Sequence, residues 1–188
     1  MADIYSRAAK PRPRKASREI AKQSQGVDVS GGGRALWFVE AIFLAYRDFI
    51  GEPDRILAEI GFGRAHHRVL YFVDRYPGMR VADLLDILQI TKQSLARVLR
   101  ELIRESYIRQ ISGETDRRER RLYPTDKGTA LAMRLTELQL DKVCKALDAV
   151  GQDGRAAVAT FFQHMAPDAG RLAVLRKTGP ARGAGDGE

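Results

Sequence analysis

The sequence predicts a mainly α-helical fold that contains one short β-hairpin, and three observations support this prediction. Apolar residues recur at helical spacing through most of the segment from residue 34 to residue 166. Two of these helical patterns, 81–88 and 91–107, are separated only by Gln89 and Ile90. Two β-prone runs with turn residues between them follow the second pattern. This order of elements predicts a winged helix-turn-helix flanked by further helices.

The composition restricts the classes of partner and compartment. The chain has 188 residues, and its 32 lysines and arginines against 24 acidic residues give a net charge of +8. A surplus of this size favours polyanionic partners. Cys144 is the single cysteine, which excludes an intramolecular disulfide and a cysteine-based zinc cluster. Residues 1–33 contain no apolar signal segment, and we therefore expect a cytoplasmic protein.

We expect residues 1–33 to form a disordered basic arm, because they are rich in Lys, Arg, Pro, Ser and Gly and cannot bury a core. The arm is either a solvated tail or a non-specific grip on DNA, and its sequence leaves both interpretations open. Residues 167–188 have a similar Gly-, Ala- and Arg-rich composition. We expect them to form a second disordered tail.

The segment 34–62 is predicted to form N-terminal dimerisation helices. Its first part, 34–50, is apolar on all sides of a helix, so one side can pack on its own chain while another requires a partner. It is shorter than the roughly 20 apolar residues of a membrane span. We expect Gly51–Pro53 to end this helix and 54–60 to form a short second one.

Residues 63–125 are predicted to form the winged helix-turn-helix domain. A first helix, 64–76, has an apolar face and ends at Pro77 and Gly78. After the short helix 81–88, Thr91 is suited to cap the next helix at its N-terminus. The buried stripe of that helix is predicted to contain Leu95, Leu99, Leu102 and Ile103. Its opposite face presents Lys92, Gln93, Ser94, Arg97, Arg100 and Arg104.

The hairpin that follows is predicted to be a basic wing. Residues 107–112 are β-prone, 113–116 have turn composition, and the chain returns through Leu122 and Tyr123. Arginines stand at 117, 118, 120 and 121. Like charges crowded onto one hairpin repel one another unless an anionic partner meets them. Contact with DNA is therefore the favoured interpretation of the wing.

Residues 126–166 are predicted to form C-terminal dimerisation helices. A long helix runs from Thr125 to Val150, Gly151 to Gly154 interrupt it, and a last helix covers 155–165. The apolar character of the first and last helices favours pairing with a second copy in a two-fold symmetric homodimer. We expect Cys144 to be buried and unreactive among apolar neighbours on this helix.

The residues from LLDILQITKQSLARVLRELIRESYIRQ to DRRERRLYPTDKG resemble the MarR family of transcription regulators. The wing of that family carries Asp-x-Arg, then a strand and Leu-Thr-x-x-Gly. Asp116-x-Arg118 and Pro124-Thr125-x-x-Gly128 match these motifs. The resemblance extends over roughly residues 34–165. It implies a homodimer on a palindromic operator, and a small-molecule effector bound between the dimerisation helices and the winged domain.

On this hypothesis the helix from Thr91 enters the major groove and the wing enters the flanking minor groove. The side chains nearest base edges are Lys92, Gln93, Ser94 and Arg97. Arg100 and Arg104 meet phosphates, as do Arg117, Arg120 and Arg121. Arg118 reaches into the minor groove, and Asp116 holds it pointing outward. The alternative is a basic module that binds RNA or a protein, although the hairpin offers no aromatic platform for stacking RNA bases.

No motif for catalysis or for a cofactor is present. The chain has no P-loop, nucleophile elbow or paired-carboxylate motif, so we predict neither enzymatic activity nor a cofactor. His66 and His67 are neighbours on a predicted helix and point about 100° apart, which disfavours a shared metal ion. Most of seven aromatic residues are expected in the core, and a minority in an effector pocket. They are Trp37, Phe38, Phe43, Tyr46, Phe62, Tyr71 and Phe72.

Overall fold

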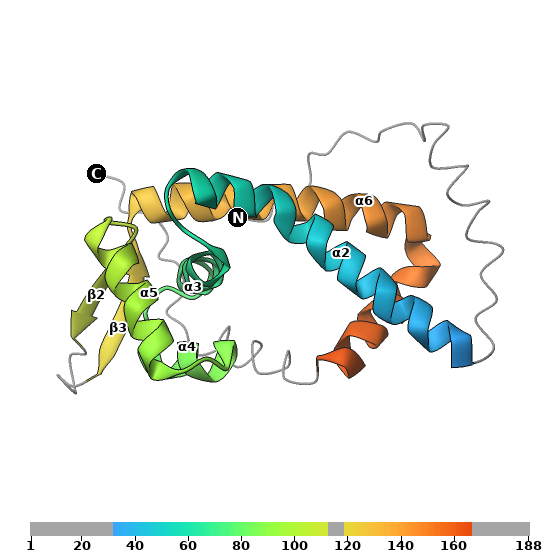
Figure 1. Cartoon of the computed structure of the whole chain (residues 1–188), viewed down its shortest axis with the longest axis horizontal. Coiled ribbons are helices and arrows are strands. Elements are labelled where there is room, and N and C mark those ends of the chain that lie inside the picture. Colours follow the sequence, from blue (N-terminus) through green and yellow to red (C-terminus); the bar gives the residue numbers. More distant parts are fainter. Residues whose placement is uncertain (1–31, 113–118, 167–188) are drawn as a thin grey trace. The chain divides into compact units, whose positions relative to one another are not determined.

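The computed structural model describes residues 32–112 and 119–166, and confirms the mainly α-helical fold with a small sheet. The expected tail 167–188 and all but the last two residues of the expected arm lie outside the described residues. The chain divides into two compact units, with the boundary between Tyr46 and Arg47, and the winged helix-turn-helix belongs to the second unit. The elements (Figure 1) are α2 (Gly32–Glu59), α3 (Arg64–Arg75), β1 (Met79–Arg80), α4 (Val81–Leu88), α5 (Lys92–Arg104), β2 (Ile108–Ser112), β3 (Arg120–Pro124) and α6 (Asp126–Met165).

Helix α2 differs from the prediction in two places. It begins at Gly32, so Gly32 and Gly33 belong to the helix and not to the arm. It also continues through Pro53, where a break was expected. Proline lacks the N–H that a helix interior uses and normally interrupts the helix. Here the Pro53 side chain is fully buried, and we attribute the continuity of α2 to this packing, which offsets the lost hydrogen bond.

Of the two helices of the helix-turn-helix, α4 has the predicted bounds and α5 the predicted cap, but α5 ends at Arg104 and not at residue 107. Helix α4 covers Val81–Leu88 and buries Leu84 and Leu88. The turn begins at Gln89, which adopts the left-handed conformation (φ 50°, ψ 44°) and donates its side-chain N–H to the Asp86 carbonyl at 2.6 Å. Thr91 caps α5 as predicted, because its hydroxyl accepts the Ser94 N–H at 3.1 Å. The turn is therefore built without glycine.

The wing belongs to a three-stranded antiparallel sheet in the order β1-β3-β2. Strands β2 and β3 pair from Ile108 opposite Pro124 to Ser112 opposite Arg120, which confirms the predicted hairpin. Strand β1 was not predicted, because two residues are too few to show an alternating pattern. The tip of the wing, 113–118, lies outside the described residues, and with it the predicted sites Asp116, Arg117 and Arg118.

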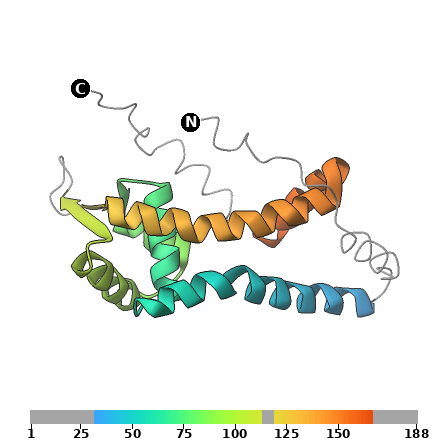
Figure 2. The same ribbon diagram turned by 90° about the horizontal axis from the view of Figure 1, so that it is seen from above.

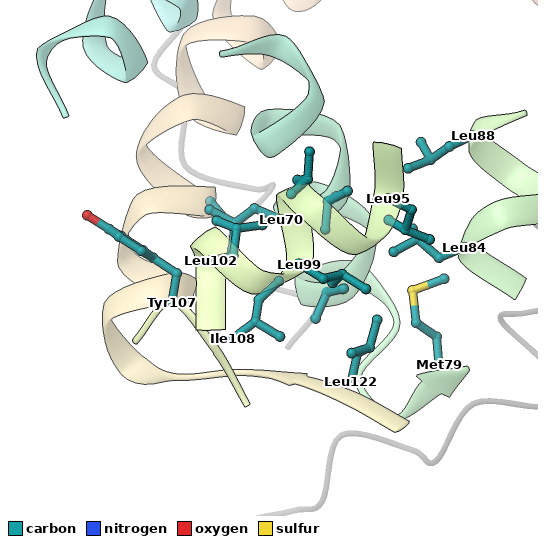
Figure 3. Packing of buried hydrophobic residues seen from close by; sticks show 14 of the residues in the cluster. Leu70, Met79, Leu84, Leu88, Leu95, Leu99, Leu102, Tyr107, Ile108 and Leu122 are labelled. Atoms are coloured by element: carbon teal, nitrogen blue, oxygen red, sulfur yellow. The ribbon is translucent and has the colours of Figure 1, made fainter. Parts of the chain in front are cut away.

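A single apolar cluster holds α3, α4, α5 and the sheet together (Figure 3). Leu102 and Leu122 are fully buried in it, and so is Leu70 of α3. Ile103, expected on the buried stripe of α5, is only partly buried, whereas Val98 joins the stripe. The buried members that Figure 3 labels are Leu70, Met79, Leu84, Leu88, Leu95, Leu99, Leu102, Tyr107, Ile108 and Leu122.

Helix α6 is joined to the wing by one residue with several contacts. The Thr125 hydroxyl accepts the Gly128 N–H at 3.1 Å and donates to the Ser106 carbonyl at 2.7 Å. It therefore caps α6 and ties the helix to the chain between α5 and β2. Gly128 lies against the Tyr107 carbonyl, where a side chain has no room. The match to Thr-x-x-Gly thus has a structural reason: threonine caps the helix, and glycine permits the close approach.

The second half of α6 is interrupted as predicted. Gly151 has φ 78° and ψ 175°, outside the helical region, and the chain changes direction there (Figure 1 and Figure 2). The prediction for Cys144 is wrong, because this side chain is exposed. Leu140 and Val150 on the same part of the helix are also exposed. The apolar stripe that suggested burial is not covered by the described residues of one chain.

The apolar segment at the start of α2 is exposed as well. The prediction of a core position is wrong for its four aromatic residues, while Phe62 is buried and Tyr71 and Phe72 are partly buried. None of the helices in the described segments meets the length and hydropathy of a bilayer span. The exposed large apolar residues of the segment are Leu36, Trp37, Phe38, Val39, Ile42, Phe43, Leu44 and Tyr46.

Candidate nucleic-acid interface

Helix α5 has one buried apolar face and one exposed polar face. The buried side chains are Leu95, Val98, Leu99 and Leu102. All six predicted contact residues of the helix are exposed, namely Lys92, Gln93, Ser94, Arg97, Arg100 and Arg104. The apolar positions recur three or four residues apart, so packing against α3 and α4 turns the intervening polar positions outward. The structure therefore brings the predicted helical contacts together on one solvent-exposed surface.

The charged residues of this surface differ in how they are held. Arg97 Nε lies 3.1 Å from Glu101 Oε1, and Arg104 Nε lies 3.0 Å from Glu105 Oε1. Among the described residues, neither Lys92 nor Arg100 forms an ion pair. Ser94 also takes part in the cap, since its hydroxyl accepts from the Thr91 hydroxyl at 2.9 Å. Two of the cations are thus available to an anionic ligand without breaking an existing pair.

The two described arginines of the wing have different surroundings. Arg120 is exposed, and its Nη1 donates to the Ser112 hydroxyl at 2.6 Å across the strand pair. Arg121 is partly buried, with Nη2 2.6 Å from Glu119 and Nη1 donating to the Gly78 carbonyl at 3.4 Å. Arg121 therefore ties β3 to the chain before β1. Its predicted contact with phosphate stays a prediction.

Sequence reasoning missed the arginine that opens α4. Arg80 donates through its backbone N–H and its side chain to Asp83, with Nη2 to Oδ1 at 2.6 Å. These hydrogen bonds, together with the nearby charge of Arg121, hold the pKa of Asp83 below its usual value despite partial burial. An acidic residue three positions after a helix cap is a readable signal for this arrangement. It fixes the start of the helix that supports α5.

A second contact that the sequence did not indicate joins α3 to α5. The Nε2 atom of His66 lies 2.6 Å from Glu101 Oε2, and the same carboxylate pairs with Arg97. The hydrogen bond from His66 first, and that from Arg97 second, lower the pKa of Glu101. The spacing of four residues between Arg97 and Glu101 is a readable helix signal. The partner on α3 is 35 residues away in sequence, and no local pattern shows it.

The neighbouring histidine is in a different environment. His67 is buried, and this burial lowers its pKa, although the charge of Asp54 opposes the shift. His66 and His67 thus meet different partners. Within the described segments, no three His, Cys, Asp or Glu side chains are grouped as a metal site would require.

His67 is expected to make the folded state sensitive to acid. Its folded-state pKa lies below the unfolded value near 6.5, so the unfolded chain binds the extra proton more readily. The resulting stability is complete above pH 6.5 and is lost as the pH falls through the folded-state pKa. Urea unfolding between pH 7.5 and 5 should show this decline. His67→Leu should flatten it, whereas an unchanged slope in the variant would contradict the assignment.

A groove of about 750 Å³ lies beside α5. Its floor is mainly apolar and comes from α4 and α5, while Lys92, Arg100, Arg104 and Arg120 stand among its lining residues. The complete lining is Val81, Ala82, Leu85, Lys92, Leu95, Ala96, Leu99, Arg100, Ile103, Arg104, Gln110 and Arg120. A groove of this volume with a mainly apolar floor and basic lining residues suits a small amphipathic anion.

Comparisons with known proteins agree with this geometry. The model of the MarR family matches residues 60–119. The HTH-type transcriptional regulator PetP of Rhodobacter capsulatus is 46% identical over 125 residues, which are 66% of this chain and 74% of PetP.

Two solved structures of DNA complexes share the fold. Streptococcus pneumoniae FabT in complex with DNA has a TM-score of 0.63 at 17% identity, covering 76% of this chain and 99% of FabT. The transcriptional repressor CouR, bound to a 23-mer DNA duplex, has a TM-score of 0.54 at 25% identity, with coverages of 75% and 96%. The similarity therefore includes the helices on either side of the winged domain.

Proposed function

Because the chain belongs to the MarR family of transcription regulators, we propose that it is a homodimer that binds a palindromic DNA operator in a sequence-specific manner. The observation that carries this proposal is the exposed polar face of α5, which begins at a capped N-terminus beside the short helix α4. A helix in this setting fits the major groove, with its N-terminal residues nearest the base edges.

In this proposal, the residues of α5 divide between bases and phosphates. Lys92, Gln93, Ser94 and Arg97 occupy the first half of the helix and contact bases. Arg100 and Arg104 lie further along, where the helix leaves the groove, and meet phosphates. Their exposure and the absence of an ion pair at Arg100 among the described residues support this division.

The wing is proposed to follow the DNA backbone into the adjacent minor groove. Arg120 supports this part, because it is exposed on a strand whose register is set by five residue pairs with β2. Arg117 and Arg121 complete the proposed phosphate contacts. Arg118, held by Asp116, is proposed to enter the groove, where a narrow A·T-rich segment concentrates negative potential.

Homodimer formation is proposed from the exposed apolar surfaces at both ends of the chain. The first unit exposes Leu36 by 65% and Phe43 by 69%. In the second unit, the last part of α6 exposes Phe162 by 62%. Contiguous apolar surface of this kind is rare on a monomer and marks an interface. A two-fold dimer also presents two copies of α5, as a palindromic site requires.

Modulation by a small-molecule effector is a further part of the proposal. The groove beside α5 supports it, although this groove lies within the winged domain and not between that domain and the dimerisation helices, where the family resemblance implied an effector. A ligand bound there would meet Arg100 and Arg120, the same cations that are proposed to meet DNA. An anionic ligand would then compete with phosphates for them. DNA titrations repeated with small aromatic carboxylates test this part, and unchanged affinity across such a panel would argue against it.

Arg97→Ala provides the sharpest test of the DNA-binding proposal. A bidentate arginine–guanine contact contributes roughly 1–3 kcal/mol of discrimination, so the variant should lose preference at one position in each half-site. Selection of bound sequences from random duplex DNA measures this directly. Two positions related by a dyad are expected to change.

Arg100→Ala is the matched control, since it removes the same charge one turn later. It should weaken binding to all sequences and lower the salt slope by about one. Single-stranded RNA and single-stranded DNA serve as competitors when the DNA affinities of the two variants are measured. Preferential binding to a single strand, or loss of affinity without loss of preference in Arg97→Ala, would contradict the proposal.

A further inference from the structure

Arg97 is connected through one carboxylate to a second helix. Its Nε donates to Glu101 Oε1 at 3.1 Å, while the other oxygen of Glu101 lies 2.6 Å from His66 Nε2. Glu101 thus links an exposed side chain of α5 to the first turn of α3. The exposed fractions of the side chains rise along this path, from 12% at His66 to 25% at Glu101 and 78% at Arg97.

The inner end of this path is fixed by the start of α3. The Gly63 N–H donates to His66 Nδ1 at 3.1 Å, so the histidine closes the first turn of the helix. Phe62 stacks on the imidazole ring with centroids 4.5 Å apart and planes 4° from parallel. Because Nδ1 accepts a hydrogen bond, the ring proton is on Nε2 and is donated to Glu101. The contact with His66 therefore fixes the position of the Glu101 carboxylate that accepts from Arg97.

We propose that Glu101 and His66 are positioning residues that preset the guanidinium of Arg97 for a DNA base. This inference rests on the proposed DNA-binding function. Glu101 accepts from Nε of Arg97, which leaves the two Nη nitrogens of this exposed side chain as a fork without a partner among the described residues. Such a fork is what the O6 and N7 atoms of guanine accept. A long side chain that is already fixed in the free protein loses less conformational entropy when DNA binds. This saving raises the affinity roughly threefold to tenfold.

A contribution to folding does not account for the ion pair of Arg97 and Glu101. An exposed ion pair four residues apart on a helix contributes little to folding. The neighbouring pair of Arg104 and Glu105 has similar geometry, at 3.0 Å, but among the described residues the Glu105 carboxylate has no second anchor. Of these two carboxylates, Glu101 is the one that combines an exposed arginine with a partly buried partner on another helix. This second contact restricts the direction in which Arg97 points.

The test compares Glu101→Gln with Glu105→Gln in the full-length protein. Both variants remove one negative charge at the C-terminal end of α5, Glu101 in its last turn and Glu105 at its C-cap, and so raise the general attraction to DNA similarly. Arg97 and His66 donate to different oxygens of Glu101, and glutamine replaces one of these oxygens with an NH2 donor, so one of the two contacts is lost. We expect Glu101→Gln to lower discrimination between the selected operator and a duplex altered at the position read by Arg97 by threefold to tenfold. Glu105→Gln should leave that ratio unchanged.

Two further variants separate positioning from folding. His66→Phe keeps the stack on Phe62 but removes both hydrogen bonds, and should lower the same ratio by a smaller factor. In an Arg97→Ala background, Glu101→Gln should have no further effect on the ratio, because the side chain it positions is gone. Thermal unfolding of each variant shows whether it is folded at the assay temperature. If Glu101→Gln is not folded at the assay temperature, His66→Phe and Glu101→Asp replace it in the comparison with Glu105→Gln.

The outcomes distinguish this inference from the proposed function. If the wild type shows no sequence preference, the proposed function fails and the inference fails with it. If the wild type has a preference and Glu101→Gln behaves as Glu105→Gln does, only the positioning role is overturned. A specific gain of operator affinity in Glu101→Gln would also overturn it, because the carboxylate would then be competing with the base for Arg97.

Discussion

Gly128→Ala is expected to destabilise the protein by about 3 kcal/mol or more and to abolish DNA binding. A Cβ atom at this position would lie 2.0 Å from the Tyr107 carbonyl oxygen. This neighbour is backbone, and Thr125 bonds to the same carbonyl through its N–H at 3.1 Å, so neither side can move easily. The start of α6 would have to separate from the chain that leads from α5 into the wing. For a chain of this size, the loss corresponds to a fall in Tm of roughly 6–12 °C.

Gly51→Ala is the matched control, because Gly51 is also inside a helix but has nothing within 4 Å of the added Cβ. Alanine is preferred over glycine in a helix by about 1 kcal/mol, so this variant should be stabilised. Urea unfolding of both variants measures the two free energies. Changes of the same sign and similar size would contradict the packing argument.

Phe43→Glu is expected to convert the proposed dimer to a monomer. The side chain is 69% exposed in an apolar segment, and a buried unpaired carboxylate at a dimer interface is strongly unfavourable. Loss of the second half-site contact should lower affinity for the full palindrome by roughly 10²–10⁴, while affinity for an isolated half-site stays the same. Sedimentation and titrations on both duplexes measure the two effects. Leu36→Glu and Trp37→Glu should act in the same way.

Ala58→Glu adds the same charge to an exposed position of the same helix outside the apolar segment, and should leave the dimer intact. This comparison separates the interface from a general effect of charge on α2. Sedimentation that shows a well-folded wild-type monomer at micromolar concentration would contradict the proposed dimer. So would a Phe43→Glu protein that keeps full affinity for the palindrome.

Much of the winged domain could be predicted from sequence because its signals are local. Thr91 caps its helix as expected, and Thr125 stands where a helix was expected to begin; each accepts an N–H three residues further on. The period of the leucines in α5 separates its buried and exposed faces, and so identifies the exposed residues that are proposed to contact DNA. The interruption at Gly151 was equally readable, since glycine adopts a positive φ without strain.

The residues that could not be predicted depend on partners far away in the sequence. By itself, the sequence determined the two helices of the helix-turn-helix, the cap at Thr91 and the face of α5 that meets solvent, because each depends on residues within one or two turns. Only the tertiary structure decided that Pro53 remains inside α2, that Cys144 is exposed, and that His66 holds Glu101 across 35 residues. Burial and long-range hydrogen bonds depend on which surfaces of the protein pack together. A local sequence pattern does not show which distant segment packs against it.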